Sequence, residues 1–284
     1  DNIPRALGKN CLVIHHIGST AIPGLKAKPI IDILPVVNDI QNINIHAMQE
    51  LGYEYKGEAG MAFRQFFQKP LQFNVHIYKE GDPEVMRYLK FRDWLRKNDE
   101  DAKRYEQIKV ELAEKFPLDL RQYCMGKEAI VSDIDGKNGY EGWRMVQALT
   151  EREWEAVRSL RNKNFFKEMP DPFTWTFNRN DHIHFVFYKN NKIVGYCHLQ
   201  LWLDLRAAIR IFAIDESYRR QGLGKLFLSL CERWLRYQGY RQIVTQSNPK
   251  AVPFYKQCGY VDMPFKDPEN NPTDPNDLEL GKNL

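Results

Sequence analysis

Short apolar runs alternate with turn residues in the first half of the chain. Two strand-like runs, CLVIHHIG at 11–18 and PIIDILPVV at 29–37, are joined by a Gly-Ser-Thr turn and the loop IPGLKAK. The runs FRQFFQ at 63–68 and LQFNVHIY at 71–78 flank Lys69-Pro70, and this spacing predicts a strand pair. The first half is therefore predicted to contain a β-sheet.

Helical spacing follows these strands. Asp82 offers an N-cap and Pro83 suits the first helical position, so a helix is predicted to begin there and to end near Lys97. A second helix is predicted where apolar residues again recur every three or four positions. The two apolar stripes are Val85, Leu89 and Trp94, and then Ala102, Tyr105, Ile108 and Leu112.

The stretch SDIDGKNGYEG at 132–142 is polar and rich in glycine, as linkers are. We place a domain boundary between Lys137 and Glu141 and divide the chain into residues 1–138 and 139–284. A length of 284 residues suits two domains.

The second half begins with a strand, WRMVQAL at 143–149, and Thr150 with Glu153 forms a capping box that predicts a helix from Glu151. The next elements are three strands, an amphipathic helix, a strand, a short helix and a last strand. They are HIHFVFYKN (182–190), KIVGYCHLQLWL (192–203), AAIRIFAID (207–215), the stripe Leu223, Leu226, Phe227, Leu230 and Trp234, RQIVTQSN (241–248), KAVPFYKQCG (250–259) and DLELGKNL (277–284). The turn-rich segment 266–277 is predicted to be a surface loop. This order of elements predicts a two-domain α+β protein.

Composition narrows the class of protein. With 43% hydrophobic and 27% charged residues, the chain has the composition of a globular protein, and a net charge of +4 is too small to indicate nucleic-acid binding. Five scattered cysteines without a C-x-x-C pair argue against a disulfide framework and against a structural zinc site. No apolar run approaches the ~20 residues that span a membrane. We expect a cytoplasmic protein with no metal, nucleic-acid or membrane partner, and a first residue other than Met leaves open an element before residue 1.

The segment YRRQGLGK at 218–225 lies between a predicted strand and the amphipathic helix. Gly222 and Gly224 let backbone N–H groups approach an anion, and the helix start directs its free N–H groups and the positive end of its dipole to the same point. Lys225 is not followed by Ser or Thr, and no G-x-G-x-x-G is present, so the segment is neither a P-loop nor a Rossmann fingerprint. It predicts a pyrophosphate site.

The second half resembles the GCN5-related N-acetyltransferase (GNAT) family over about residues 143–284. The family signature, R/Q-x-x-G-x-G/A, is supplied in part by Arg220, Gln221, Gly222, Leu223 and Gly224, flanked by Arg219 and Lys225. A second motif, NPKAVPFYKQCGY at 248–260, follows in the family order. The resemblance implies a mixed, mostly antiparallel sheet flanked by helices, acetyl-CoA as cofactor, and direct transfer of the acetyl group to an amine.

The resemblance also implies roles for single residues. Asn248 would approach the pantetheine arm, and Tyr255 would protonate the leaving thiolate as general acid. The strand at 207–215 would splay at a bulge, so that the main chain of Phe212, Ala213 and Ile214 binds the pantetheine amides and the acetyl carbonyl.

The general base is left open by the sequence. His198, on the neighbouring strand with Asp204 at its end, is the candidate. The alternative is that His198 and Tyr255 only pack in the core, and that Arg219 is a solvated charge.

The string HHIGSTAIPGLKAKPIIDI at 15–33, with RQFF, VHIY and FRDWLR, resembles the GrpB (UPF0157) family from about residue 15 to 137. The resemblance implies a nucleotidyltransferase-like α/β domain, in which two acids at i and i+2 after a Gly-Ser turn join a third acid to hold two Mg²⁺ ions. Asp32 fits one acid, but Ile30 takes the partner position and His76 replaces the third. One acid makes a poor two-metal site.

Two interpretations of these first-half residues stay open. They form an anion or nucleotide pocket, or they only stabilise the fold. The residues are Gly18, Ser19, Thr20, Lys28, Asp32, His76, Arg92 and Arg96.

The leading functional hypothesis is an acetyl-CoA-dependent N-acetyltransferase, a monomer or homodimer, that acts on a small-molecule or peptide amine, with a first half of unclear role that could recognise the substrate. One alternative is a nucleotidyltransferase or nucleotide-binding protein acting through the first half. The other is a non-catalytic module that binds acyl-CoA or regulates a partner.

Overall fold

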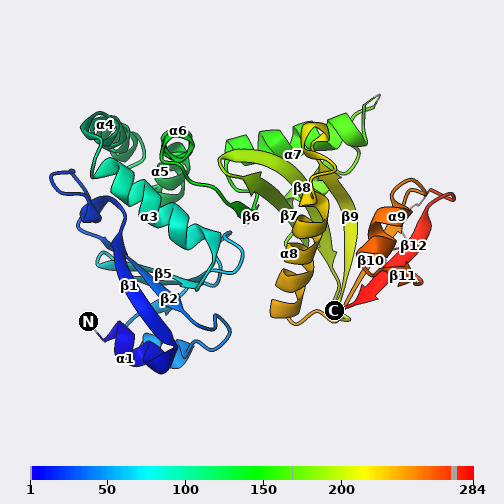
Figure 1. The fold of residues 1–284 in the computed structure, drawn as a ribbon, viewed down its shortest axis with the longest axis horizontal. Coiled ribbons are helices and arrows are strands. Elements are labelled where there is room, and N and C mark those ends of the chain that lie inside the picture. Colours follow the sequence, from blue (N-terminus) through cyan, green and yellow to red (C-terminus); the bar gives the residue numbers. More distant parts are fainter. Residues whose placement is uncertain (1, 168, 270–273) are drawn as a thin grey trace. The chain divides into compact units, whose positions relative to one another are not determined.

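The computed structural model describes residues 2–167, 169–269 and 274–284 (Figure 1). The chain forms two compact units: unit 1 comprises Asp1–Arg144 and Lys189–Lys192, and unit 2 comprises Met145–Tyr188 and Ile193–Leu284. The boundary between residues 138 and 139 stays a prediction. Within the predicted surface loop 266–277, residues 270–273 lie outside the described residues.

Unit 1 is built on a five-stranded mixed sheet with the order β1-β2-β5-β4-β3. Its strands are β1 (Cys11–Ile17), β2 (Ile31–Val37), β3 (Glu54–Tyr55), β4 (Gln65–Lys69) and β5 (Phe73–Lys79). Strands β2 and β5 run parallel, with Asp32 opposite Asn74, whereas β1 with β2 and β4 with β5 are antiparallel. The two predicted runs and the predicted strand pair are confirmed.

Six helices of unit 1 lie in the described residues: α1 (Ile3–Leu7), α2 (Ile45–Glu50), α3 (Pro83–Leu95), α4 (Asp99–Lys115), α5 (Leu120–Gly126) and α6 (Glu128–Lys137). The side chain of Asp82 accepts a hydrogen bond from Glu84 N at 3.0 Å, so α3 begins at the predicted cap. Helices α3 and α4 confirm the two predicted helices, and α4, α5 and α6 lie together beside α3 (Figure 1).

The polar segment 132–142 is helical over its first six residues. Helix α6 continues to Lys137 because Ile130 and Ile134, four residues apart, are buried against Tyr105 in the core. Asp133 and Lys137 pair at 3.0 Å beside this buried stripe. Polar residues on the exposed side of α6 therefore had the appearance of a linker.

Unit 2 contains a seven-stranded sheet with the order β11-β12-β10-β9-β8-β7-β6. Its strands are β6 (Trp143–Gln147), β7 (His182–Lys189), β8 (Lys192–Leu201), β9 (Arg206–Ile214), β10 (Gln242–Ser247), β11 (Val261–Asp262) and β12 (Leu278–Asn283). Strands β9 and β10 are parallel, whereas β8 with β9, β10 with β12 and β11 with β12 are antiparallel. The predicted mixed, mostly antiparallel sheet is confirmed, and only the short β11 was not predicted.

The helices α7 (Glu151–Asn164), α8 (Leu223–Tyr237) and α9 (Val252–Gln257) flank this sheet (Figure 1). The predicted capping box starts α7: Thr150 N donates to Glu153 Oε2 at 2.9 Å, and Glu153 N donates to Thr150 Oγ1 at 3.3 Å. Helix α8 is fixed to the sheet by Phe227, whose ring stacks on those of Phe187 and Phe212 at 4.7 and 5.2 Å.

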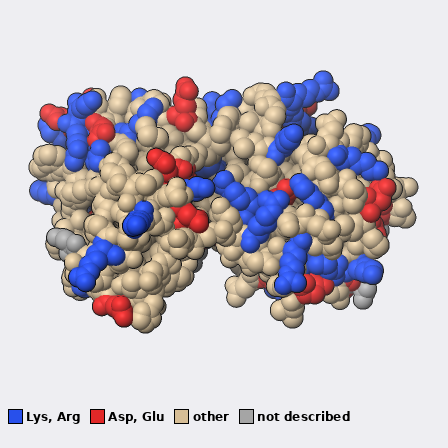
Figure 2. Space-filling model, turned by 60° about the horizontal axis from the view of Figure 1, so that its bottom comes forward, with Lys and Arg blue, Asp and Glu red and all other residues tan. Residues whose placement is uncertain are grey.

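Within the described ranges, no helix is long and apolar enough to cross a membrane. On the face that Figure 2 shows, Lys and Arg side chains are interspersed with Asp and Glu.

Candidate functional site

A short loop connects β9 to α8 in unit 2. Arg220 (φ 58°) and Gly222 (φ 77°) adopt the left-handed region, and together they turn the chain into the helix. Gly222 is the N-cap of α8 and has no side chain that could bond the helix start. The first N–H groups of α8, which a helix leaves without an internal partner, are therefore available to an anion.

Gly224 serves a different purpose. A Cβ atom at this position would lie 3.2 Å from Cε2 of Phe254 and 3.7 Å from Cγ1 of Ile214. Gly224 therefore lets the start of α8 pack closely against α9 and the end of β9.

The strands β9 and β10 separate next to this loop. Their parallel pairing ends at Ile209 and Thr245. The register between β8 and β9 shifts where β9 carries Arg210 as an extra residue. Beyond this bulge, in the described part of the two strands, residues 210–214 of β9 have no pairing partner in β10. The predicted splay is present, and it leaves the main chain of Phe212, Ala213 and Ile214 on an open strand edge.

Two of the predicted cofactor-binding residues are engaged by the protein itself. Arg219 donates from Nε to Ile214 O at 3.0 Å and from a terminal nitrogen to Asn164 Oδ1 at 2.6 Å. The side chain of Asn248 accepts from Lys250 N at 3.0 Å. Arg219 thus fastens the loop to β9 and α7, whereas Arg220 and Lys225 are exposed.

Two other residues of this loop, Leu223 and Gln221, differ in burial. Leu223 is buried in the core, so only its main chain faces the loop. Gln221 is exposed and donates from its side chain to Ser217 O at 3.3 Å.

Tyr255 of α9 is buried, and its hydroxyl is hydrogen-bonded to Thr245 at the point where β9 and β10 separate. Burial raises the pKa of Tyr255 above its usual value. The hydroxyl therefore keeps its proton at neutral pH, as a proton or hydrogen-bond donor must.

A cavity of about 600 Å³ adjoins the splay. Ile209, Arg210 and Ile211 of β9 and Gln246 of β10 form one of its walls. Aromatic side chains form much of the remainder, namely Phe165, Phe166, Phe173, Trp175 and Phe265. A mostly apolar cavity with a few polar groups is the usual form of a small-molecule site.

The charges around this cavity do not cancel. Arg161, which is fully buried, binds Asp171 through two hydrogen bonds of 2.5 and 2.9 Å. Arg210 binds Asp267 at 2.7 Å. Asp274 and Asp277 also line the cavity, and within the described residues neither has a cationic side chain within 4.0 Å. Burial and the nearby Asp274 raise the pKa of Asp277. Because Arg161 and Arg210 are already paired with carboxylates, these two aspartates are the groups left to attract a cation.

Three histidines converge beside the cavity, although the sequence singled out only His198. His184 Nε2 can only donate to Thr176 O, at 3.3 Å, so its Nδ1 accepts from the Tyr196 hydroxyl at 2.7 Å. Tyr196 in turn accepts from Arg161 at 3.0 Å. Burial lowers the pKa of His184 to about 4, so this histidine is a neutral structural residue.

His198 and His182 form a second pair. The distance from His182 Nδ1 to His198 Nε2 is 2.7 Å, and both residues line the cavity. His198 Nδ1 and His182 Nε2 are buried and lack a hydrogen-bond partner in the described structure. Burial, with His184 and His182 nearby, holds the pKa of His198 well below its usual value. Asp204 pairs with Arg206 at 2.7 Å, so the orienting partner of His198 is His182.

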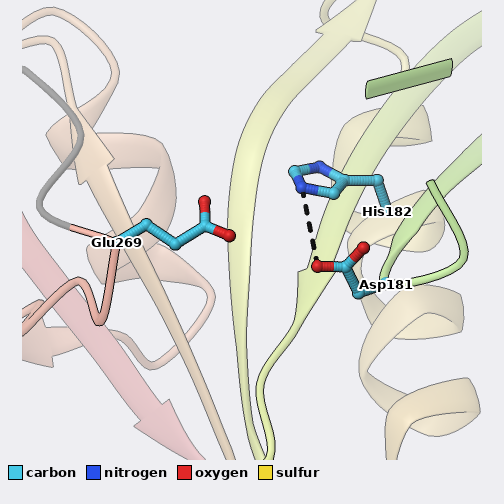
Figure 3. A group of neighbouring side chains, drawn as sticks. All are labelled: Asp181, His182 and Glu269. Atoms are coloured by element: carbon cyan, nitrogen blue, oxygen red, sulfur yellow. Dashed lines mark ion pairs between the residues drawn. The ribbon is translucent and has the colours of Figure 1, made fainter. Parts of the chain in front are cut away.

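Asp181, His182 and Glu269 are a group of described residues that could offer metal ligands, because one atom of each lies within 4.8 Å of the others (Figure 3). His182 points toward Asp181, with 3.9 Å between Nε2 and Oδ2. Both oxygens of Asp181, however, accept hydrogen bonds from Arg179 at 2.8 Å. Arg179 already supplies the positive charge, and we assign no metal to this group.

In unit 1, Gly18 and Asp32 are in close contact. A Cβ atom at Gly18 (φ 70°) would overlap Oδ2 of Asp32 and lie 2.8 Å from its Cγ. Asp32 accepts from Asn74 at 2.9 Å and lies 3.5 Å from His76 Nε2. Burial raises the pKa of Asp32, but the bonds from His76 and Asn74 outweigh it and leave the pKa below its usual value.

The two arginines of the predicted pocket hold the loop after β1. Arg92 donates to His16 O at 3.0 Å, and Arg96 donates to Ala21 O at 2.9 Å. Thr20 Oγ1 is likewise bonded to His16 Nε2 at 2.9 Å. Ser19 begins the 3₁₀ turn that follows Gly18. These contacts favour a structural role for both arginines.

Comparison with known proteins separates the same two parts of the chain. The family model described as GrpB protein matches residues 1–137, and the model of the Acetyltransferase (GNAT) family matches residues 143–260. The chain is 41% identical over 133 residues to UPF0157 protein YqkA of Bacillus subtilis, covering 45% of this chain and 39% of that one. It is 37% identical over 136 residues to UPF0157 protein BH1888 of Halalkalibacterium halodurans, covering 46% and 70%.

Among solved structures, the crystal structure of an acetyltransferase of the GNAT family from Staphylococcus aureus Mu50 has 19% identity and a TM-score of 0.42, covering 50% of this chain and 99% of that one. The match to UPF0157 protein YqkA of Bacillus subtilis spans about two fifths of the length of that relative.

Proposed function

Because the chain belongs to the GrpB (UPF0157) family in its first half and carries a GNAT acetyltransferase domain in its second, we propose that unit 2 transfers the acetyl group of acetyl-CoA to an amine. The observation that carries the proposal is the splay of β9 from β10 beside the glycine-capped start of α8. An open strand edge and an anion-binding helix end suit a ligand with both amides and a pyrophosphate.

The main chain does most of the binding in this proposal. The N–H groups at Gly222, Leu223 and Gly224 receive the pyrophosphate, and Arg220 and Lys225 add positive charge at the surface. The edge at Phe212, Ala213 and Ile214 bonds the pantetheine amides. Arg219 positions the loop through Ile214 O and Asn164.

Tyr255 is proposed to donate a hydrogen bond to the sulfur that leaves. Its raised pKa keeps the hydroxyl protonated, and its bond to Thr245 directs it to the splay. Such a donor stabilises negative charge that develops on the sulfur.

The amine proton leaves through two histidines in this proposal. When His198 Nε2–H donates to His182 Nδ1, the Nδ1 atom of His198 is free to accept a proton. The proton on Nε2 then moves to His182 Nδ1, and the proton on His182 Nε2 moves toward Asp181, 3.9 Å away and half-buried. A relay of this kind does not require His198 to stay charged, which agrees with its lowered pKa.

The cavity suggests the class of acceptor. Five aromatic side chains suit a flat or apolar body, and Asp274 with Asp277 suits a positive charge. We propose a cationic amine with an apolar or aromatic portion as the acceptor.

Calorimetric titration of the full chain with acetyl-CoA tests the proposal. We expect saturable binding that Gly222→Glu abolishes, because a carboxylate would stand among the N–H groups. Gly239→Glu is the matched control, since Gly239 also has a positive φ and open space but lies just beyond the far end of α8. No heat with the wild-type protein, or equal losses in both variants, would refute the assignment. A screen of cationic amines by thiol release then identifies the acceptor.

A further inference from the structure

Two segments of unit 1 carry the same pattern, a tyrosine followed four residues later by a lysine. The pairs are Tyr105 with Lys109 in α4, and Tyr123 with Lys127 at the end of α5. Helical spacing brings each lysine onto its tyrosine. The Lys109 Nζ lies 5.4 Å from the Tyr105 ring centroid, and the Lys127 Nζ lies 4.6 Å from that of Tyr123.

A third lysine joins them from the loop between β1 and β2. The Nζ of Lys28 lies 4.3 Å from the same Tyr123 ring. Lys28 and Lys127 therefore contact the same ring. The distance between their Nζ atoms cannot exceed the sum of the two distances to the ring centroid. Burial, together with the charge of Lys127, lowers the pKa of Lys109 to about 8. We call Lys28, Lys109 and Lys127 the three-lysine cluster.

The positive charge of the cluster is not balanced within the protein. Among the described residues, no carboxylate oxygen lies within 4.0 Å of any of the three Nζ atoms, although the neighbouring Lys26 has Glu106 at 3.9 Å. From a greater distance, Asp32 attracts both Lys127 and Lys109, and Glu106 attracts Lys109. Glu106 already accepts a hydrogen bond from Lys26 N at 2.8 Å. Asp32 is already bound by Asn74 and His76.

A structural role accounts for only part of the cluster. Lys109 donates to Lys26 O at 2.9 Å, which ties the loop to α4. This bond uses one of the three N–H donors of one lysine. Lys28 and Lys127 are each attracted to the Tyr123 ring, but two ammonium groups beside one ring also repel each other, which a bound anion would relieve.

We propose that the three-lysine cluster binds the phosphoryl group of a phosphate-bearing ligand. Ammonium groups bind phosphate as point charges from several directions. The buried rings of Tyr105 and Tyr123 position the three ammonium groups. Because the nearby carboxylates, Asp32 and Glu106, are already bonded within the protein, the cluster itself neutralises the phosphate, and binding does not depend on a divalent cation. This site is independent of acetyl transfer in unit 2.

Calorimetry of the full chain in low salt with EDTA tests the proposal with four probes: sodium tripolyphosphate, sodium pyrophosphate, ADP and adenosine. We expect tripolyphosphate and ADP to bind and adenosine to give no heat. Tighter binding of ADP than of pyrophosphate would identify a nucleotide as the source of the phosphoryl group, and equal binding would identify free polyphosphate. All titrations are run in the Gly222→Glu background, so that phosphate cannot bind at α8.

Substitutions then locate the site. Lys127→Met and Lys28→Met each weaken binding about tenfold or more, the loss expected for one charge-assisted hydrogen bond. Lys127→Arg retains binding. Lys103→Met, on the exposed side of α4, is the matched control and leaves it unchanged. Lys28 is exposed, so its variant keeps the test valid if Lys127→Met does not fold. The proposal is overturned if neither phosphate probe binds, or if Lys28→Met and Lys127→Met bind as tightly as Lys103→Met.

Discussion

Gly18→Ala tests whether the glycine after β1 is required by the close approach of Asp32. Gly18 has a φ of 70°, and a Cβ atom there would overlap Asp32 Oδ2 and lie 2.9 Å from its Cβ. The variant must therefore distort the loop or displace the carboxylate from Asn74 and His76.

The magnitude has two parts. A non-glycine residue in the left-handed region costs about 1–2 kcal/mol. Displacing Asp32 leaves buried hydrogen-bonding groups without partners, at about 1–3 kcal/mol. We expect the free energy of opening of β1 and β2 to fall by about 3 kcal/mol in total. Gly57→Ala is the control, because Gly57 has a φ of 61° and no atom within 4 Å of a Cβ position, so only the backbone term of about 1 kcal/mol remains.

Hydrogen exchange of the full chain, followed by mass spectrometry in peptides from β1 and β2, measures this local free energy. The double variant Gly18→Ala with Asp32→Ala removes the overlapping carboxylate, and we expect it to be more stable than additivity predicts, by about 1–3 kcal/mol. If Gly18→Ala is no more destabilising than Gly57→Ala, the overlap with Asp32 does not constrain this position.

Four further predictions follow from unit 2. Tyr255→Phe should lower kcat about a hundredfold while acetyl-CoA affinity measured by calorimetry is kept, and an unchanged kcat would remove Tyr255 from the acid role. His182→Phe should lower kcat/KM although His198 remains, and an unaltered value would leave His198 to act alone. Arg161→Ala leaves Asp171 in a buried site without its partner. It should lower the free energy of unfolding in urea by about 3–5 kcal/mol, unlike Arg158→Ala at an exposed position. The pKa of His184 is lowered to about 4 in the folded protein, so the unfolded chain binds a proton more readily. The contribution of His184 to the free energy of unfolding is therefore complete above pH 6.5 and falls by up to about 3 kcal/mol toward pH 4. His184→Gln should flatten this pH dependence.

Features encoded by neighbouring residues could be predicted from the sequence. The helix starts at Asp82 and Thr150 depend on a cap and one or two residues after it. The loop before α8 is likewise local, because Gly222 and Gly224 are needed for the turn and for contact with Phe254.

Features that depend on register could not be predicted. His182 and His198 meet because the hairpin between β7 and β8, with Asn190 at a φ of 55°, places these two residues side by side. A KNNK turn is compatible with more than one register, and a shift of one residue would put His198 on the other face. The sequence therefore indicated His198 but not its partner.

Arginine positions misled the sequence analysis for a different reason. Arg92 and Arg96 have the charge expected of phosphate ligands, yet they donate to His16 O and Ala21 O. Carbonyl groups in an irregular loop need donors as strongly as an anion does. Only coordinates separate these two uses of a guanidinium group.

The two phosphate sites proposed for this chain differ in the chemistry of their donors. Main-chain N–H groups at the start of α8 do not titrate, so acetyl-CoA affinity should stay level between pH 7 and 9. The three-lysine cluster depends on Lys109, whose pKa is lowered to about 8 because it is buried and lies near Lys127. Loss of that proton removes a charge, and tripolyphosphate affinity should fall by up to about tenfold per pH unit above pH 8. Because only one of the two sites loses a charge in this range, two pH series separate them: acetyl-CoA with the wild-type chain, and tripolyphosphate with the Gly222→Glu variant.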